Sequence, residues 1–303
     1  MTRFRLGTRG SPLALTQARM VRAALSTTHS WAEDDIEIVV IKTTGDLVQD
    51  RALAEIGGKA LWTKELDRAL LAGEIDCAVH SMKDVETIRP TEIVIAAMLP
   101  RADVRDRLIG AESIAALRKG AIIGTSSPRR SAQLRRLRPD LRIVLLRGNV
   151  DTRLAKVASG EIDATLLAAA GLDRLGRGDV GAAIDIGVML PAPAQGAVGI
   201  EARADSDAAR AVAAISDAAT MTCVLAERAL LAALNADCHS PMAALAVIEG
   251  EALHLRGELF AADGAAHVVG DATGAVGASD FPATLAADLL ARAPTEVRAL
   301  FGG

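Results

Sequence analysis

Residues 4–12 read FRLGTRGSP and residues 121–128 read AIIGTSSP, so the chain uses one local pattern twice. In both places an apolar run passes through Gly-Thr into Ser-Pro. Serine is a favoured helix N-cap and proline suits the first helical position, so each stretch predicts a strand followed at once by a helix. A second echo, GEID at residues 73–76 and 160–163, precedes an apolar run both times. We therefore predict two similar α/β domains.

Strands and helices are expected to alternate outward from these two stretches. Short apolar runs predict strands over residues 4–8, 36–42, 77–81, 93–98, 121–125, 142–146, 164–167 and 197–201. Helical spacing predicts helices over residues 12–25 and 61–72, and helices that begin at Pro128 and Val150. Such alternation is typical of mainly parallel sheets that are covered on both faces.

The last part of the chain follows another pattern. A long helix is expected over residues 216–234 and a turn over 235–241. Three expected strands, 243–248, 252–260 and 267–273, read as an antiparallel meander, and a closing helix is expected over 281–292. This tail is predicted to be an α+β region distinct from the two preceding domains.

Composition excludes several classes of protein. Half of the 303 residues are apolar and 24% are charged, which excludes a disordered chain. With 2% aromatic residues and no Tyr, a function built on base stacking is not expected. No apolar run approaches 18 residues, and no apolar leader opens the sequence, so we expect a cytoplasmic protein without a membrane partner. Three widely spaced cysteines without a Cys-x-x-Cys motif predict no disulfide and no metal site.

Positive charge is concentrated in one segment, although the net charge is −4. Residues 118–153 contain ten Lys or Arg residues against two Asp residues. The segment either meets an anion or forms a solvated basic face. A nucleic-acid interface over residues 129–142 is a rival interpretation, but the prolines at 128 and 139 limit its helix, and no aromatic residues are interspersed.

Several of these cations fall at predicted helix starts. Arg9 precedes one Ser-Pro helix, Arg129 and Arg130 lie in the first turn of the other, and Arg147 precedes a third helix. A helix N-terminus carries partial positive charge, so cations there are favourable when an anion joins them. The alternative is pairing with surface Asp and Glu. Their shared place at the carboxyl ends of strands, where open α/β sheets bind ligands, favours the ligand.

Two further stretches carry reactive side chains. Lys83 and Asp84 follow the strand predicted over 77–81, where they would bind an anion and stabilise a cation, although such a pair is usually solvated. Cys238 lies in a predicted turn, whereas Cys77 and Cys223 lie in apolar runs. A loop thiol can carry a covalent group, while a buried thiol is mostly packing.

Taken together, seven motifs resemble the hydroxymethylbilane synthase (porphobilinogen deaminase) family in order and spacing over nearly the whole chain. They are GTRGSPLA (7–14), HSMKDV (80–85), GTSSPRR (124–130), LRGNV (146–150), residues 169–175, QGAVGIE (195–201) and the late loop cysteine.

The resemblance implies a transferase of tetrapyrrole and haem biosynthesis. Four porphobilinogen molecules would be joined head to tail, with loss of ammonia, on a dipyrromethane cofactor held by a thioether to Cys238. Hydrolysis would then release hydroxymethylbilane. The expected partner is this small-molecule substrate, not nucleic acid, and a cytoplasmic monomer is expected. A non-enzymatic protein that binds a small anion between two lobes is the alternative.

The resemblance also refines the fold class. It implies an α/β protein with two periplasmic-binding-protein-like lobes, mainly parallel sheets and a C-terminal α+β domain with a small antiparallel sheet. The expected boundaries are residues 1–98 and 197–215 for lobe 1, 99–196 for lobe 2 and 216–303 for the cofactor-attachment domain.

Site residues follow from matching positions. Asp84 is the expected catalytic carboxylate, and Lys59 and Trp62 are expected in a mobile loop. Besides Cys238, the positions expected to bind the cofactor are Lys83, Thr125, Ser127, Arg129, Arg130 and Asn149. The positions expected to bind substrate are Arg9, Ser11, Ser81, Arg147, Arg153, Arg174 and Gln195.

Three positions depart from the family pattern. Asp237 stands where glycine usually precedes the loop cysteine, which questions the conformation of that loop. Pro128 replaces a usual leucine, and Glu86-Thr87 replaces a usual Pro-Thr.

Overall fold

The computed structural model describes residues 4–43 and 63–301, which divide into two compact units. Unit 1 comprises Met1–Ala102 and Gly196–Met221, and unit 2 comprises Asp103–Gln195 and Thr222–Gly303. Unit 1 covers nearly the ranges expected for lobe 1. The expected second lobe and the tail fall together in unit 2, and their separation into two domains stays a prediction.

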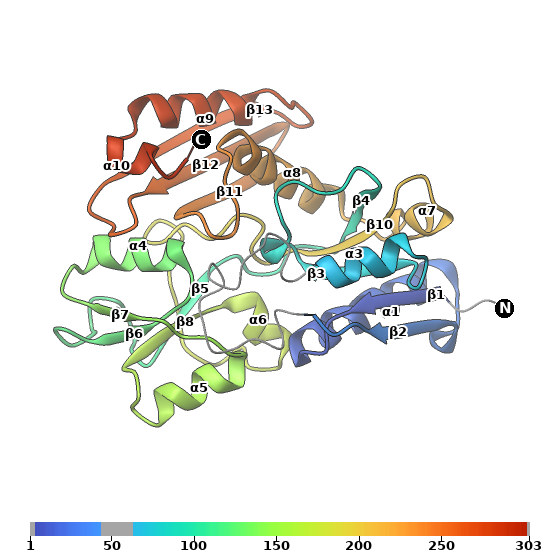
Figure 1. Cartoon of the computed structure of the whole chain (residues 1–303), viewed down its shortest axis with the longest axis horizontal. Helices are drawn as coiled ribbons and strands as arrows, with labels where there is room; N and C mark the ends of the chain where they lie inside the picture. The colour runs from blue at the N-terminus through green and yellow to red at the C-terminus, as the bar shows by residue number, and fades with distance from the viewer. Residues whose placement is uncertain (1–3, 44–62, 302–303) are drawn as a thin grey trace. The chain divides into compact units, whose positions relative to one another are not determined.

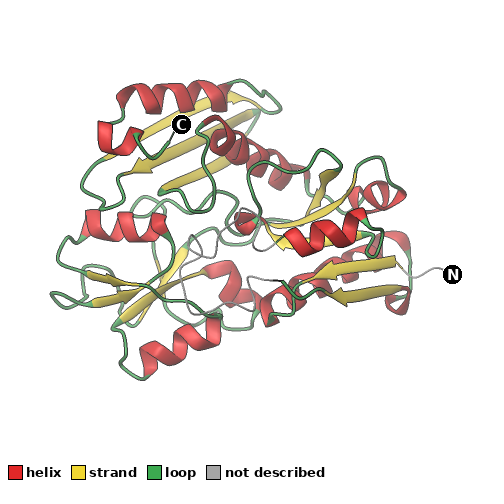
Figure 2. Ribbon diagram, in the orientation of Figure 1, coloured by secondary structure: helices red, strands yellow, loops and turns green. Residues whose placement is uncertain are grey.

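Unit 1 is built on a five-stranded mixed sheet (Figures 1 and 2). Its strand order is β2 (Ile36–Val40), β1 (Phe4–Thr8), β3 (Cys77–Ser81), β10 (Val198–Arg203) and β4 (Ile93–Met98). The pairs of β1 with β2 and with β3 are parallel, whereas β10 is antiparallel to both neighbours. Its helical elements are α1 (Pro12–His29), η1 (Glu33–Asp35), α3 (Lys64–Leu71), η3 (Met82–Asp84), α7 (Asp207–Ala213) and the start of α8 (Ala218–Ala233).

Helices cover both faces of this sheet, as the apolar strands require. Side chains alternate between the faces of a strand. Cys77 and Val79 of β3 pack with α1, while the intervening Ala78 packs with Leu66 and Leu70 of α3. The sheet core is therefore enclosed between α1 and α3.

The second five-stranded sheet, in unit 2, repeats this plan. Its strand order is β7 (Arg142–Val144), β6 (Ile122–Gly124), β8 (Ala164–Ala168), β5 (Asp106–Ile109) and β9 (Ala182–Ala183). The helices that follow its parallel strands are α4 (Pro128–Leu137), α5 (Val150–Ala158) and α6 (Ala169–Arg174). As in unit 1, the first three strands of the order are parallel and the fourth is antiparallel to both neighbours. The predicted α/β class is confirmed, and each sheet is mixed.

The sequence echoes occupy matching positions in the two sheets. Asp76, in the first GEID, accepts a hydrogen bond from the backbone N–H of Arg5 at 2.7 Å. Asp163, in the second, accepts one from the N–H of Ile122 at 2.6 Å. Each aspartate thus ties the start of one parallel strand to the start of its neighbour, which explains why the motif recurs.

The C-terminal part of unit 2 contains the expected antiparallel meander. Strands β11 (Met242–Glu249), β12 (Ala252–Phe260) and β13 (His267–Ala275) form it, and α9 (Phe281–Arg292) and α10 (Thr295–Arg298) follow. Ala244 and Ala246 of β11 face α8 and α9, whereas Ala243 and Leu245 pack with Ala132 of α4. Packing on both faces joins this sheet to the rest of unit 2.

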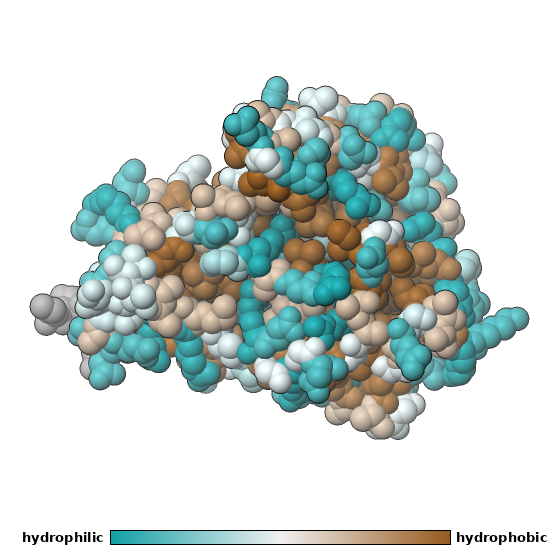
Figure 3. Space-filling view, turned by 180° about the vertical axis from the view of Figure 1, so that it is seen from behind, coloured by the Kyte–Doolittle hydropathy of each residue, from teal (hydrophilic) through white to brown (hydrophobic). Residues whose placement is uncertain are grey.

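In the described part of the chain, no single helix is both long and apolar enough to cross a membrane. Helices α7 and α8 reach that length and apolarity only when taken together, and this pair is bent by 113°. Exposed apolar side chains are scattered, as Val40, Ile88 and Leu145 illustrate. On the face shown in Figure 3, polar and apolar residues are intermixed.

We expect Gly264→Ala to destabilise the protein by about 3 kcal/mol, because alanine is strained at positive φ and its Cβ would collide with helix α4. Gly264 has a φ of +75°, and a Cβ there would lie 3.0 Å from the backbone nitrogen of Arg136 and closer to the carbonyl of Ala132. Gly250→Ala is the control: its φ is +62°, but it has open space around it. Urea unfolding checks both, and equal losses would contradict the packing argument.

Candidate functional site

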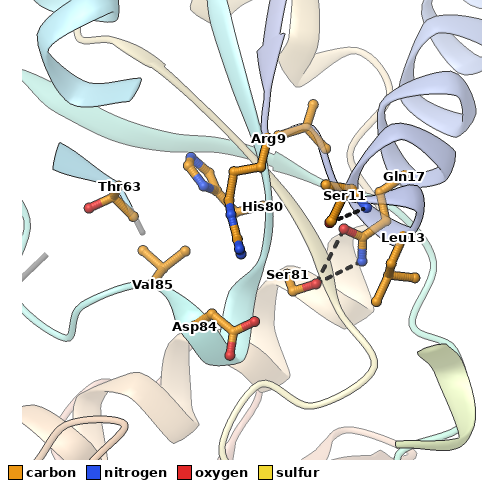
Figure 4. A pocket seen from close by; sticks show the side chains of 11 residues that line it. Arg9, Ser11, Leu13, Gln17, Thr63, His80, Ser81, Asp84 and Val85 are labelled. Atoms are coloured by element: carbon orange, nitrogen blue, oxygen red, sulfur yellow. Dashed lines mark hydrogen bonds between the residues drawn. The ribbon is translucent and has the colours of Figure 1, made fainter. Parts of the chain in front are cut away.

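In unit 1, four of the predicted site residues line one pocket at the carboxyl ends of β1 and β3. They are Arg9, Ser11, Ser81 and Asp84. Figure 4 shows the Arg9 side chain extending into the pocket toward the Asp84 carboxylate, with Ser81 on the facing wall. A cation and a carboxylate therefore share one concave site, as expected for a ligand that carries charges of both signs.

Local backbone structure fixes these side chains. Ser11 caps α1 by accepting a hydrogen bond from the N–H of Ala14, and Pro12 takes the first helical position, as predicted. Gln17 of α1 donates its amide to Ser81 Oγ at 2.8 Å. This bond between a helix and a strand sets the position of the Ser81 hydroxyl in the pocket.

Asp84 is presented by a short 3₁₀ turn directly after β3. The N–H of Met82 donates to the carbonyl of Ala197 at 3.1 Å, and the Met82 side chain is 1% exposed. A Cβ on Gly199 would lie 2.6 Å from Met82 Cγ, so glycine leaves the space in which Met82 is buried. Lys83 lies in the same turn, but it does not line the pocket that holds Asp84.

In unit 2, the predicted residues gather where parallel strands pass into helices. Ser127 caps α4 and accepts from the N–H of Arg130, while Asn149 caps α5 and accepts from the N–H of Thr152. Thr125 Oγ1 accepts from the N–H of Ser127 at 3.1 Å. The other predicted residues near these junctions are Arg147, Arg153, whose Nε donates to the carbonyl of Gly148, and Arg174 in the last turn of α6.

Arg129 and Arg130 converge on a carboxylate that the sequence analysis did not single out. Asp106, 1% exposed, accepts from Arg129 at 2.8 Å and from Arg130 at 2.7 Å. The buried Gln195 amide donates to the same carboxylate at 3.0 Å. Burial alone would raise the pKa of Asp106, but the charges and hydrogen bonds of the two arginines hold it well below 3.8.

These contacts favour internal pairing for both arginines. Arg129 also donates to Gln133 and to the carbonyl of Leu190, and Arg130 donates to the carbonyl of Leu166. Burial lowers the pKa of Arg129, and Asp106 opposes that effect. Arg129 and Arg130 are therefore paired with an acidic residue in a buried rather than a surface position, and their role in ligand binding stays a prediction.

Three further cations of the basic segment also have partners within unit 2. Arg138 binds Asp140 at 2.7 Å and donates to carbonyls of the 114–117 segment, and Arg118 binds Asp163 at 2.6 Å. Arg135 donates to the carbonyl of Ala262. Several of the positive charges that are clustered in the sequence thus have separate partners elsewhere in unit 2.

Cys238 is exposed in the turn between α8 and β11. Cys77 and Cys223 are buried, and burial raises the pKa of the Cys77 thiol well above its ordinary range. Asp237 lies outside the positive-φ region, which Asn235 occupies instead with a φ of 50°. The Asp237 carboxylate accepts from the N–H of His239 at 2.8 Å, so aspartate fits here without the freedom of glycine.

Two predicted loop residues, Lys59 and Trp62, lie outside the described residues. Within residues 4–43 and 63–301, no group of His, Cys, Asp and Glu is arranged to hold a metal ion.

We expect Asp106→Ala to cost about 3–5 kcal/mol of folding free energy, because it leaves two buried guanidinium groups without their shared anion. Because the pKa of Asp106 is lowered in the folded protein, the carboxylate contributes its full share to the free energy of unfolding at pH values above its ordinary pKa of 3.8. That share is lost as the pH falls below 3.8. The control is Asp288→Ala, which removes an exposed carboxylate paired with Arg292 and should leave the urea midpoint nearly unchanged. Urea unfolding is measured for both variants, and equal unfolding midpoints would show that the buried pairing contributes nothing to the free energy of unfolding.

Comparison with known proteins identifies the family. A family model described as "Porphobilinogen deaminase, dipyromethane cofactor binding domain" matches residues 4–211, and "Porphobilinogen deaminase, C-terminal domain" matches residues 221–291. The chain is 58% identical to the porphobilinogen deaminase of Sphingopyxis alaskensis, across 98% of this chain and 96% of the relative. It is 50% identical to that of Paracoccus denitrificans, across 97% and 95%.

Solved structures that match part of the chain include a periplasmic substrate-binding protein from Coxiella burnetii, with 14% identity, 72% and 94% coverage of the two chains and a TM-score of 0.43. Another is a periplasmic solute-binding protein from Pseudomonas putida F1, with 13% identity, 76% and 81% coverage and a TM-score of 0.39. The family matches confirm the predicted deaminase activity and the predicted dipyrromethane cofactor. The chain belongs to the porphobilinogen deaminase family.

Proposed function

We propose that the chain joins porphobilinogen molecules head to tail through Asp84, and that Cys238 is the point at which the dipyrromethane is attached. The observation that carries the proposal is the pocket of unit 1, which holds the Asp84 carboxylate together with Arg9 and Ser81. The near full-length match to porphobilinogen deaminases favours this transferase over a non-enzymatic anion-binding protein. A cytoplasmic location and a monomeric state belong to the same proposal.

The chemistry of Cys238 fits a covalent attachment site. A thioether needs a sulfur that a pyrrole can reach, and Cys238 is the exposed cysteine of the three. Hydrogen bonds around Asp237 and Ser240 hold the turn that presents it. When bound, the dipyrromethane supplies the pyrrole carbon to which the first monomer is joined.

Asp84 supplies the negative charge that the reaction requires. Loss of ammonia from porphobilinogen leaves a cationic methylene-pyrrolenine, and a fixed carboxylate beside the pyrrole N–H stabilises this spreading charge. The same carboxylate is suited to move protons during deamination and ring deprotonation. The buried Met82 and the Ala197 carbonyl hold the turn, so the carboxylate is oriented before substrate arrives.

Cations and hydroxyl groups hold the acetate and propionate groups of the pyrroles. In unit 1 this role falls to Arg9, Ser11 and Ser81, and each charge-assisted bond would contribute about 1.5–3 kcal/mol. Lys83 has the same role in unit 1. In unit 2 we assign binding to residues at or near the helices that follow the parallel strands: Thr125, Ser127, Arg147, Asn149, Arg153 and Arg174. Arg129, Arg130 and Gln195 would help to bind the carboxylate groups while they keep their hydrogen bonds to Asp106.

Cys238→Ser should lose the covalent cofactor, because a hydroxyl cannot replace the thiol in the thioether. The intact mass of the denatured wild-type protein is expected to exceed the sequence mass by two pyrrole units, whereas Cys238→Ser should show the sequence mass. Cys223→Ser, at a buried cysteine, is the control and should keep the adduct. An adduct that survives in Cys238→Ser would refute the attachment site.

Asp84→Ala should lower kcat by about 10²–10³-fold or more while the fold is retained, because the cationic intermediate loses its fixed counter-charge. Asp34→Ala, in the exposed η1 turn, is the matched control and should keep wild-type turnover. Porphobilinogen consumption is followed with an aldehyde reagent for pyrroles, and circular dichroism monitors folding. A folded Asp84→Ala variant with substantial turnover would exclude the proposed role.

A further inference from the structure

Behind the pocket of unit 1, the Arg89 side chain connects three elements through a buried ionic network. Its guanidinium binds both oxygens of Glu201 on β10 at 2.8 Å. It also binds Asp67 of α3 at 2.5 Å and Glu86 at 2.8 Å. Three carboxylates from separate parts of unit 1 therefore share one planar cation, an arrangement that the forked geometry of arginine allows.

Burial makes this network costly unless every charge is paired. The side chain of Glu201 is 0% exposed and that of Arg89 is 9% exposed. Burial would raise the pKa of Glu201, but His80 and Arg89 together lower it to about 2. Burial would likewise lower the pKa of Arg89, but Glu201 and then Asp67 raise it. Glu201 and Arg89 therefore form a buried pair in which each group stabilises the charged form of the other.

The network reaches the pocket through two of its lining residues. His80 Nε2 lies 3.1 Å from the second oxygen of Glu201, and Thr63 Oγ1 donates to Glu86 at 2.6 Å. Both His80 and Thr63 line the pocket that contains Asp84 (Figure 4). The Glu201 carboxylate is thus in contact with His80 of the pocket wall and accepts hydrogen bonds from Arg89.

The network also spans the segment that presents Asp84. Asp84 ends the 3₁₀ turn, and Glu86 and Arg89 follow within five residues along the chain. On the N-terminal side of Asp84, the chain is held in place by β3 and by the buried Met82. On the C-terminal side of Asp84, Arg89 pairs with Glu86 of the same segment and connects that segment to α3 and β10 through its ion pairs with Asp67 and Glu201.

We propose that Arg89 is a positioning residue for the reaction, which through Glu201 and Glu86 holds the His80 wall and the Asp84 turn in their working geometry. This inference rests on the proposed function of Asp84. Arg89 itself does not line the pocket, so it acts through the residues that do. Small displacements of reacting groups are costly in enzymes, and about 1 Å can lower the rate by about 10²-fold.

The test compares Arg89→Leu with Arg68→Leu in the full-length protein that carries its cofactor. Arg68 forms an exposed pair with Glu74 in the same unit, so it controls for the loss of a salt bridge. We expect Arg89→Leu to lower kcat by at least about tenfold with a smaller change in KM, because geometry in the transition state is lost. Arg68→Leu should keep wild-type kcat and KM.

A pH profile distinguishes positioning from a merely structural role. The titratable and charged groups around Glu201 are His80 of β3, Asp67 of α3, and Glu86 and Arg89 of the segment that follows the 3₁₀ turn. Without Arg89, the pKa of Glu201 rises because burial is no longer opposed by that cation. Glu201 would then take up a proton at higher pH. In a plot of kcat against pH, the fall in kcat on the acid side should therefore begin at higher pH in Arg89→Leu and stay where it is in Arg68→Leu.

A second pair of variants keeps the test decisive if Arg89→Leu does not fold. Glu86→Ala removes both the Arg89 and the Thr63 contact and should lower kcat, whereas Glu86→Gln keeps an acceptor oxygen and should restore most of it. Folded Arg89→Leu or Glu86→Ala with wild-type kcat and an unshifted profile would overturn the proposal. Inactive wild-type protein would instead refute the proposed function, so the two failures are distinguishable.

Discussion

Each five-stranded sheet depends on a buried carboxylate whose charge is neutralised by arginine. In unit 2 this group is Asp106 of β5, held by Arg129 and Arg130. In unit 1 it is Glu201 of β10, held by Arg89. β5 and β10 have the same place in the strand order, antiparallel to both neighbours, although the two acids differ in register. A charge buried without a partner costs several kcal/mol, so these pairings constrain where the surrounding side chains lie.

The consequence for function is that the site residues are oriented by groups behind them. Ser81 is held by Gln17, the Asp84 turn by Met82 and the Arg89 network, and Arg129 by Asp106. Such support reduces the reorganisation needed when substrate binds, which is how preorganised electrostatics lowers a barrier. The two α/β sheets share this principle, and the exposed Cys238 turn is the attachment point that we propose for the cofactor.

Much of the fold could be predicted because local signals and tertiary packing agree. The Ser-Pro helix starts at Ser11 and Ser127, the strand over 77–81 and the C-terminal meander appear where the sequence indicates. Strand β5 is not predicted by the sequence pattern, because Asp106 and Arg107 are typical of a surface segment. Only the tertiary pairing of Asp106 with residues of α4 permits such a strand to be buried, and no local pattern records that pairing.

The site was predicted in a similar, partial way. The motifs identify Arg9, Ser81 and Asp84, which lie together in one pocket. Arg89 and Asp106 belong to no motif, and only the fold shows which buried charges they pair with. The central claim is that Asp84 drives each addition to a chain tethered at Cys238. It is tested most directly by the intact mass of the denatured protein after brief exposure to limiting porphobilinogen. The account predicts increments of one pyrrole unit above the cofactor mass in wild type and none in Asp84→Asn; equal increments in both would contradict it.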